Sequence, residues 1–103
     1  MKKLVTGILL FMVFPVTMAM TESQLVMCNT SSELAYNTMM ARQEGASMPD
    51  LWALAVKSDS VIAEQIVENA YDVTRYHSPE MQSRAAKNYR DLWFQMCIKA
   101  MKD

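Results

Sequence analysis

The sequence has very little of the residue types from which catalytic and metal sites are usually built. It contains one histidine, His77, and two cysteines, Cys28 and Cys97, that stand far apart in the chain. This pattern argues against the paired Cys and His ligands of a zinc site, and against a Cys–His or Ser–His–Asp nucleophile system. With only two glycines, the chain also has no glycine-rich phosphate-binding loop. We therefore predict that the protein is not an enzyme and needs no metal or cofactor.

Neither the paired carboxylates nor the net charge supports another functional class. Glu64 and Glu68 lie four residues apart, a spacing that puts two acids on one helix face. General acid–base pairs can be built this way, but such a pair is more typical of a solvated face. The chain has 10 basic and 11 acidic side chains, and two of the bases are Lys2 and Lys3. The remainder is therefore more acidic still, which argues against a nucleic-acid partner.

The N-terminus has the features of a secretory signal peptide. Two lysines are followed by an uncharged, apolar run over residues 4–16, and then by the small residues Thr17 and Ala19. This order predicts cleavage after Ala19. The alternative is an uncleaved membrane anchor, but the run is shorter than the ~20 residues that span a bilayer. We expect residues 1–19 to be the signal peptide and residues 20–103 to be a single helical domain, periplasmic or secreted.

Four helices are predicted in residues 20–103, and no alternating pattern predicts a strand. Each helix follows a residue that can cap a helix N-terminus, and these residues are Thr21, Ser47, Asp59 or Ser60, and Ser78. Thr21 forms a capping-box pattern with Gln24, and Gly45 suits the left-handed position after the first helix. The class is therefore all-α.

Apolar residues recur at helical spacing on one face of each predicted helix. We expect these faces to form the core: Leu25, Cys28, Ala35, Tyr36, Met39 and Met40; Leu51, Trp52, Leu54 and Ala55; Ile62, Ala63, Ile66, Val67, Ala70 and Val73; and Met81, Ala85, Tyr89, Leu92, Trp93, Met96, Cys97 and Ala100. Cys28 lies early in the first helix and Cys97 late in the last. A disulfide brings two Cα atoms within about 7 Å. We therefore predict a small bundle of about four helices, with the terminal helices antiparallel and joined by a Cys28–Cys97 disulfide.

The junction between the third and fourth helices holds the candidate binding residues. They are Tyr71, Arg75, Tyr76 and His77. Tyr and Arg are enriched among the residues that dominate binding energy at protein interfaces. The structural alternative is that Tyr76 covers the edge of the core, while Arg75 interacts favourably with the C-terminus of the third helix. Both interpretations stay open at this point.

Several short segments together resemble a family of small secreted proteins of proteobacteria and their phages. The segments are Cys28, residues 40–45, Ala70-Tyr71, Arg75-Tyr76 and the closing Trp93 with Cys97. The resemblance implies a helical, disulfide-closed periplasmic product of phage or prophage origin. It implies no catalytic residue.

These observations predict a non-enzymatic periplasmic protein that binds another periplasmic or envelope protein. A phage-encoded inhibitor acting in lysis control or superinfection exclusion fits this description. The alternative is an envelope-associated structural or stress factor that contacts membrane or cell wall. The basic residues Arg84, Lys87 and Arg90 on the last helix would suit anionic lipid headgroups in that case.

Overall fold

The computed structural model describes residues 20–102, and helices account for most of them. In chain order these helices are α3 (Glu22–Gln43), α4 (Met48–Lys57), α5 (Val61–Ala70) and α6 (Pro79–Lys102). No strand occurs among residues 20–102, so the predicted all-α class is confirmed. Within the same residues no helix combines the length and the apolar character that crossing a bilayer requires. The predicted signal peptide and its cleavage after Ala19 lie outside the described residues.

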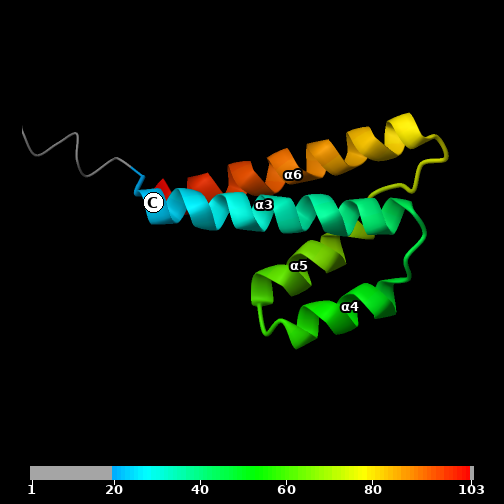
Figure 1. The fold of residues 1–103 in the computed structure, drawn as a ribbon, viewed down its shortest axis with the longest axis horizontal. Helices are drawn as coiled ribbons and strands as arrows, with labels where there is room; N and C mark the ends of the chain where they lie inside the picture. The colour runs from blue at the N-terminus through cyan, green and yellow to red at the C-terminus, as the bar shows by residue number, and fades with distance from the viewer. Residues whose placement is uncertain (1–19, 103) are drawn as a thin grey trace, which may run out of the picture.

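The two long helices, α3 and α6, form an antiparallel pair (Figure 1). A disulfide joins Cys28 in α3 to Cys97 in α6, with the Cα atoms 5.5 Å apart. The predicted pairing and the predicted antiparallel arrangement are both confirmed. The shorter helices α4 and α5 form a hairpin that lies below the half of the pair distant from the disulfide (Figure 1). Helix α5 packs on α3, and α4 packs on α5.

The helices begin at the residues whose side chains can satisfy free backbone N–H groups. The Thr21 hydroxyl accepts from the Gln24 N–H at 3.1 Å, while the Gln24 side chain accepts from the Thr21 N–H at 2.9 Å. The hydroxyls of the predicted caps Ser47 and Ser78 each accept a backbone N–H three residues later. Of the two candidate caps for α5, Ser60 is the one observed. These local bonds explain why the sequence predicted the helix starts well.

The main core lies where α5 crosses the α3–α6 pair. It consists of Ala35, Met39, Ile66, Ala70, Ala85, Ala86, Tyr89 and Trp93. Half of these residues are alanines, so the helix backbones approach closely there. A smaller cluster of Ala55, Ala63 and Val67, with Leu51 and Trp52 against it, holds α4 on α5. Beyond Trp93, α6 has no fully buried residue, so the disulfide joins the helices where the core is thin.

Several residues predicted to be buried are exposed instead. Between 40% and 62% of their surface is accessible in Leu25, Leu54, Ile62, Leu92 and Met96. The reason is a mismatch of lengths, because α4 and α5 have 10 residues each while α3 has 22 and α6 has 24. At 1.5 Å per residue, α5 is about 15 Å long and α3 about 33 Å. The hairpin therefore leaves part of the apolar surface of the long pair uncovered.

Candidate functional site

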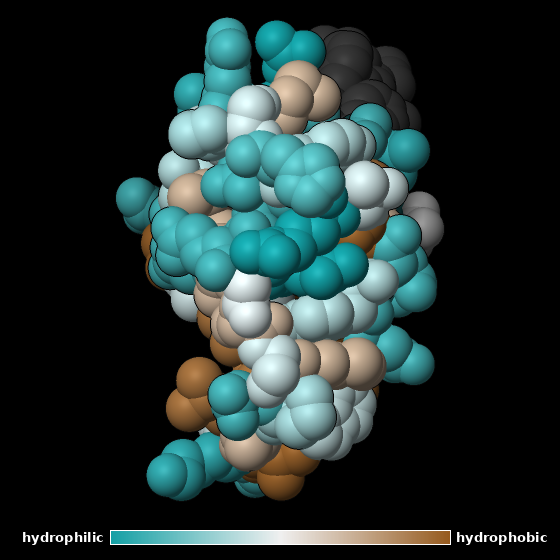
Figure 2. Space-filling view, turned by 90° about the vertical axis from the view of Figure 1, so that its right-hand side faces the viewer, coloured by the Kyte–Doolittle hydropathy of each residue, from teal (hydrophilic) through white to brown (hydrophobic). Residues whose placement is uncertain are grey.

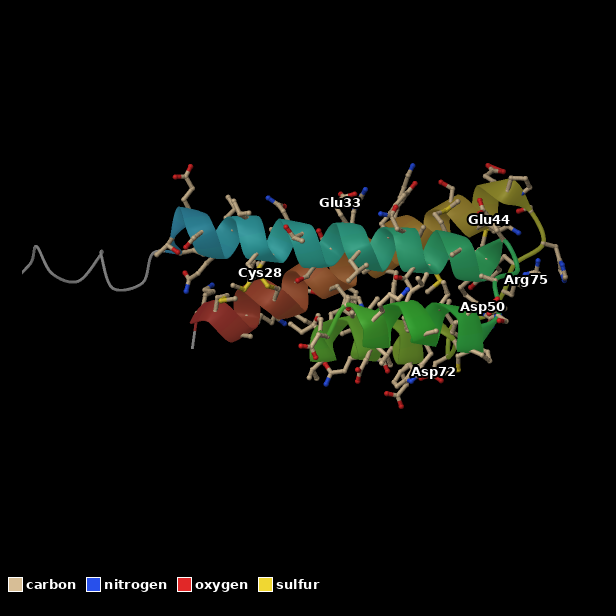
Figure 3. The ribbon with its side chains drawn as sticks, turned by 60° about the horizontal axis from the view of Figure 1, so that its bottom comes forward. Cys28, Glu33, Glu44, Asp50, Asp72 and Arg75 are labelled. Carbon is tan, nitrogen blue, oxygen red and sulfur yellow. A yellow bond between two sulfur atoms is a disulfide. The ribbon has the colours of Figure 1, made fainter. Side chains whose placement is uncertain are left out.

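The predicted binding residues lie in the connection between α5 and α6, at the end of the molecule opposite the disulfide. Figure 3 shows Arg75 at this end together with Glu44 and Asp50, and Cys28 farther along α3. Figure 2 looks onto the same end, where hydrophilic residues predominate over the upper part. Hydrophobic residues gather lower on that face, towards the α4–α5 hairpin. The structure thus brings the junction close to the end of α3.

Two of the four predicted residues use their polar atoms to fasten the junction to the end of α3 and the loop after it. The Tyr71 hydroxyl donates to the Ala46 carbonyl at 2.6 Å, and the Arg75 Nε donates to the Gln43 carbonyl at 3.0 Å. Arg75 therefore bonds the C-terminal end of α3, whereas the structural alternative in the sequence had assigned it to the third helix, α5. Its guanidinium also lies close to Gly45, whose positive φ of 106° fits the left-handed position predicted there.

Gln43 is the residue of this region that sequence reasoning missed. Its side chain is completely buried, and its Oε1 accepts from the Tyr76 N–H at 2.7 Å. Its Nε2 donates to the Thr74 carbonyl at 2.8 Å. The neighbouring Arg42 donates to the Val73 carbonyl at 3.1 Å. Consecutive residues of α3 therefore bind the backbone of the connection that follows α5.

The remaining surface of the junction is modest. Tyr71 and Tyr76 are half-buried, whereas Arg75 and His77 are exposed. The guanidinium carbon of Arg42 lies 4.7 Å from the centre of the Tyr71 ring. Burial raises the pKa of Tyr71, and the charge of Arg42 opposes that rise. The Tyr71 hydroxyl and the Arg75 Nε are thus engaged within the chain, and binding of a partner at the junction stays a prediction.

The other charged candidates are dispersed over the surface. Arg84 and Lys87 are exposed, but Arg90 is half-buried, with its Nε 3.3 Å from a carboxylate oxygen of Asp91. The Arg90 guanidinium also lies 5.6 Å from the centre of the Tyr36 ring. Among residues 20–102, no cluster of three or more His, Cys, Asp or Glu residues could hold a metal ion. The basic residues of α6 therefore form a smaller free surface than the sequence indicated.

A groove with a volume of about 640 Å³ lies between α3, α5 and α6, beside the disulfide. Apolar side chains provide most of its wall, and these are Met27, Ile62, Trp93, Met96, Ala100 and Met101. Its polar wall residues are Ser31, Gln65, Glu68 and Asn69, and Cys97 contributes the edge of the disulfide. Met27, Ile62 and Met96 are 51%, 45% and 40% exposed, so solvent reaches the apolar wall directly. A smaller hollow of about 310 Å³, lined in part by Leu34, Leu51 and Leu54, lies between α3, α4 and α5.

A rigid aromatic pair supports the groove. Trp93, at its wall, meets Tyr89 edge to face, with ring centres 6.2 Å apart and planes at 76°. The Tyr89 hydroxyl donates to the Ile66 carbonyl at 2.5 Å and so links α6 to α5. Burial raises the pKa of Tyr89 to about 12, which keeps the phenol neutral and able to donate. The groove therefore has a fixed base, while three flexible methionine side chains line its wall.

The sequence held a partial signal for this groove. Ile62, Met96 and Trp93 were all placed on apolar helix faces, but a stripe does not reveal which of its residues a neighbouring helix covers. Comparison with protein-family models, with curated proteins and with solved structures finds no match for this chain. We therefore infer the function from the residues of the groove and the junction.

Proposed function

We propose that the protein is a non-enzymatic binding protein of the periplasm that engages another envelope protein through the groove beside the disulfide. The observation that carries this proposal is the exposed apolar wall of Met27, Ile62 and Met96. Contiguous exposed apolar surface with a polar rim is typical of interaction sites. Methionines adapt their shape to a partner, which is why they are common at such surfaces.

The compartment and the biological role are part of the same proposal. A disulfide supports an oxidising compartment, and the apolar N-terminal run of the sequence supports export. The family resemblance supports a phage or prophage origin, in which the bound protein would belong to lysis control or superinfection exclusion. The lipid-binding alternative has less support, because Arg90 is engaged by Asp91 and Tyr36.

Site-specific photo-crosslinking in the periplasm of a producing cell tests the binding surface. A photoreactive benzoylphenylalanine replaces Met27 in one variant and Val26 in the other. These neighbours are 51% and 59% exposed, but only Met27 lines the groove. We expect one protein adduct, identified by mass spectrometry, from position 27 and none from position 26.

The same experiment includes the junction predicted from sequence. A third variant carries the crosslinker in place of Tyr76, which is half-buried at the opposite end of the molecule. An adduct from position 76 without one from position 27 would move the binding site to the junction. The absence of any protein adduct from position 27 would overturn the proposal for the groove.

A further inference from the structure

We infer that the groove takes a basic amphipathic helix of about two turns, contributed by the partner protein. This inference rests on the proposed function and specifies the chemistry of the bound segment. Its basis is the length of uncovered surface, the character of the groove wall and the sign of the charges around it.

The uncovered length of the α3–α6 pair matches a short helix. Helix α5 begins near the middle of the pair and runs away from the disulfide, towards the end of α3 (Figure 1). Along α6 the groove is lined from Trp93 to Met101, a separation of eight residues that corresponds to about 12 Å, or about two turns of helix. A helix placed in the groove would lie beside α5, which lines it with Ile62, Gln65 and Glu68. Its apolar residues, spaced three and four apart, would face the groove.

The wall of the groove suits one apolar face. Met27, Met96 and Met101 come from two helices and present flexible thioether side chains. Ile62 at the start of α5 closes one side, and Trp93 provides a rigid surface between them. Such a wall accepts leucine, isoleucine, methionine or phenylalanine without demanding one residue at each position. The recognised feature is therefore the apolar stripe of a helix.

The charge of the groove determines which residues can flank the apolar stripe of the bound helix. Among residues 20–102, Glu68 is the one charged residue that lines the groove. Helix α5 contains a second acid, Glu64, and no basic residue. The single base of α3, Arg42, donates a hydrogen bond to the Val73 carbonyl at the end of α3 that is distant from the disulfide. Lys99 and Lys102 in the last turn of α6 do not line the groove. Lysine or arginine beside the stripe would meet the carboxylate of Glu68, and acids there would be repelled.

A second copy of the chain fits this surface less well. In a symmetric dimer the same patch meets itself, so the Glu68 carboxylates of both copies would lie in one interface. A partner with the opposite sign of charge avoids this repulsion.

Three synthetic peptides of about 14 residues test the inference with the mature protein. All are designed as helices, and the first two share one leucine–methionine stripe but carry either lysines or glutamates on the flanks. The third has the composition of the lysine peptide with its stripe scrambled. Trp52→Phe, which removes the other of the two tryptophans, leaves Trp93 as the fluorescent reporter in the groove. We expect the lysine peptide to bind about three- to fivefold more tightly than the glutamate peptide at low salt. That difference should shrink near 1 M salt, where the screening length falls to about 3 Å.

Matched variants connect the binding to the groove. Met27→Asp should weaken the lysine peptide at least tenfold, while Val26→Asp, one residue away and outside the groove, should not. Glu68→Lys should remove the preference for lysine flanks, while Glu33→Lys on the outer side of α3 should preserve it (Figure 3). Thermal melts confirm that each variant is folded.

The outcomes separate this inference from the proposed function. If the lysine and glutamate peptides bind equally, or the scrambled peptide binds as tightly as the lysine peptide, the inference of a basic helix is overturned. This holds even when position 27 yields a crosslinked protein. If sedimentation shows a dimer that the Met27→Asp substitution dissociates, the groove binds a second copy of the chain. Binding to anionic vesicles without binding to the lysine peptide would assign it to lipid. Loss of the Met27 adduct would contradict the proposed function itself, whatever the peptides do.

Discussion

Gln43 shows how one polar side chain can position a connection between two helices. It is fully buried, although nearby Glu44 and Gly45 are exposed. Its partners, Thr74 and Tyr76, lie 31 and 33 positions later in the chain. Nothing in the local sequence distinguishes it from a solvated glutamine at a helix end. Its role depends on the tertiary fold, and for that reason the sequence did not predict it.

Replacing Gln43 with alanine should lower the free energy of unfolding by about 2–4 kcal/mol. The substitution removes two hydrogen bonds to the connection and leaves a small cavity beside Met39. Chemical denaturation of the purified protein measures the effect. Gln95→Ala, at an exposed position of α6, is the control and should change stability by less than about 0.5 kcal/mol. Equal effects at the two positions would show that the buried amide does not hold the connection.

Tyr89 should make stability dependent on pH above the neutral range. Burial raises its pKa to about 12 in the folded protein, compared with about 10 for an unfolded tyrosine. The folded state therefore favours the neutral phenol, so the contribution is complete below pH 10 and is lost as pH rises to about 12. The loss amounts to about 3 kcal/mol at most. Denaturation at several alkaline pH values measures it, and an unchanged slope in Tyr89→Phe would contradict this assignment.

At the scale of the elements, the sequence predicted what depends on neighbours along the chain. Helix starts follow from side chains that accept an N–H three residues later, as Ser47, Ser60 and Ser78 do. The end of α3 follows from Gly45, which adopts a positive φ with little strain. Class and helix order were therefore predictable from local interactions.

The extent of burial on each helix was not predictable in the same way. A stripe shows which face of a helix is apolar, but the length and placement of its neighbours decide how much of that face is covered. Ile62 and Met96 belong to stripes that also contain buried residues such as Ile66 and Trp93, yet both are exposed at the groove. The predicted second and third helices were visibly shorter than the first and last. That difference was the signal in the sequence that part of the long pair would remain open.

At the scale of the whole molecule, the two cysteines determined the arrangement of the fold. Because Cys28 lies early in the first helix and Cys97 late in the last, a bond between them predicted that these helices are antiparallel, and the structure confirms it. The placement of the α4–α5 hairpin on one half of that pair depends instead on Tyr71, Gln43 and Tyr89, which bond residues distant in the sequence. The candidate junction was visible in the sequence as a cluster of residue types that are common at interfaces. The groove was not visible there, because it forms only when the helices have packed together.

Removing the disulfide should destabilise the molecule most at the end where the core is thin. The bond closes a separation of 69 residues, for which the loop-entropy estimate gives about 4 kcal/mol. The double variant Cys28→Ser with Cys97→Ser should lose roughly this amount of stability, and reduction of the natural protein should match it. Amide exchange should accelerate most in residues 22–31 and 94–102, because α6 has no fully buried residue beyond Trp93. Residues 82–89, which pack into the main core, should retain more protection than these ends. Uniform acceleration along α6 would show that the bond stabilises the fold as one unit, and two free thiols in the natural protein would contradict the pairing itself.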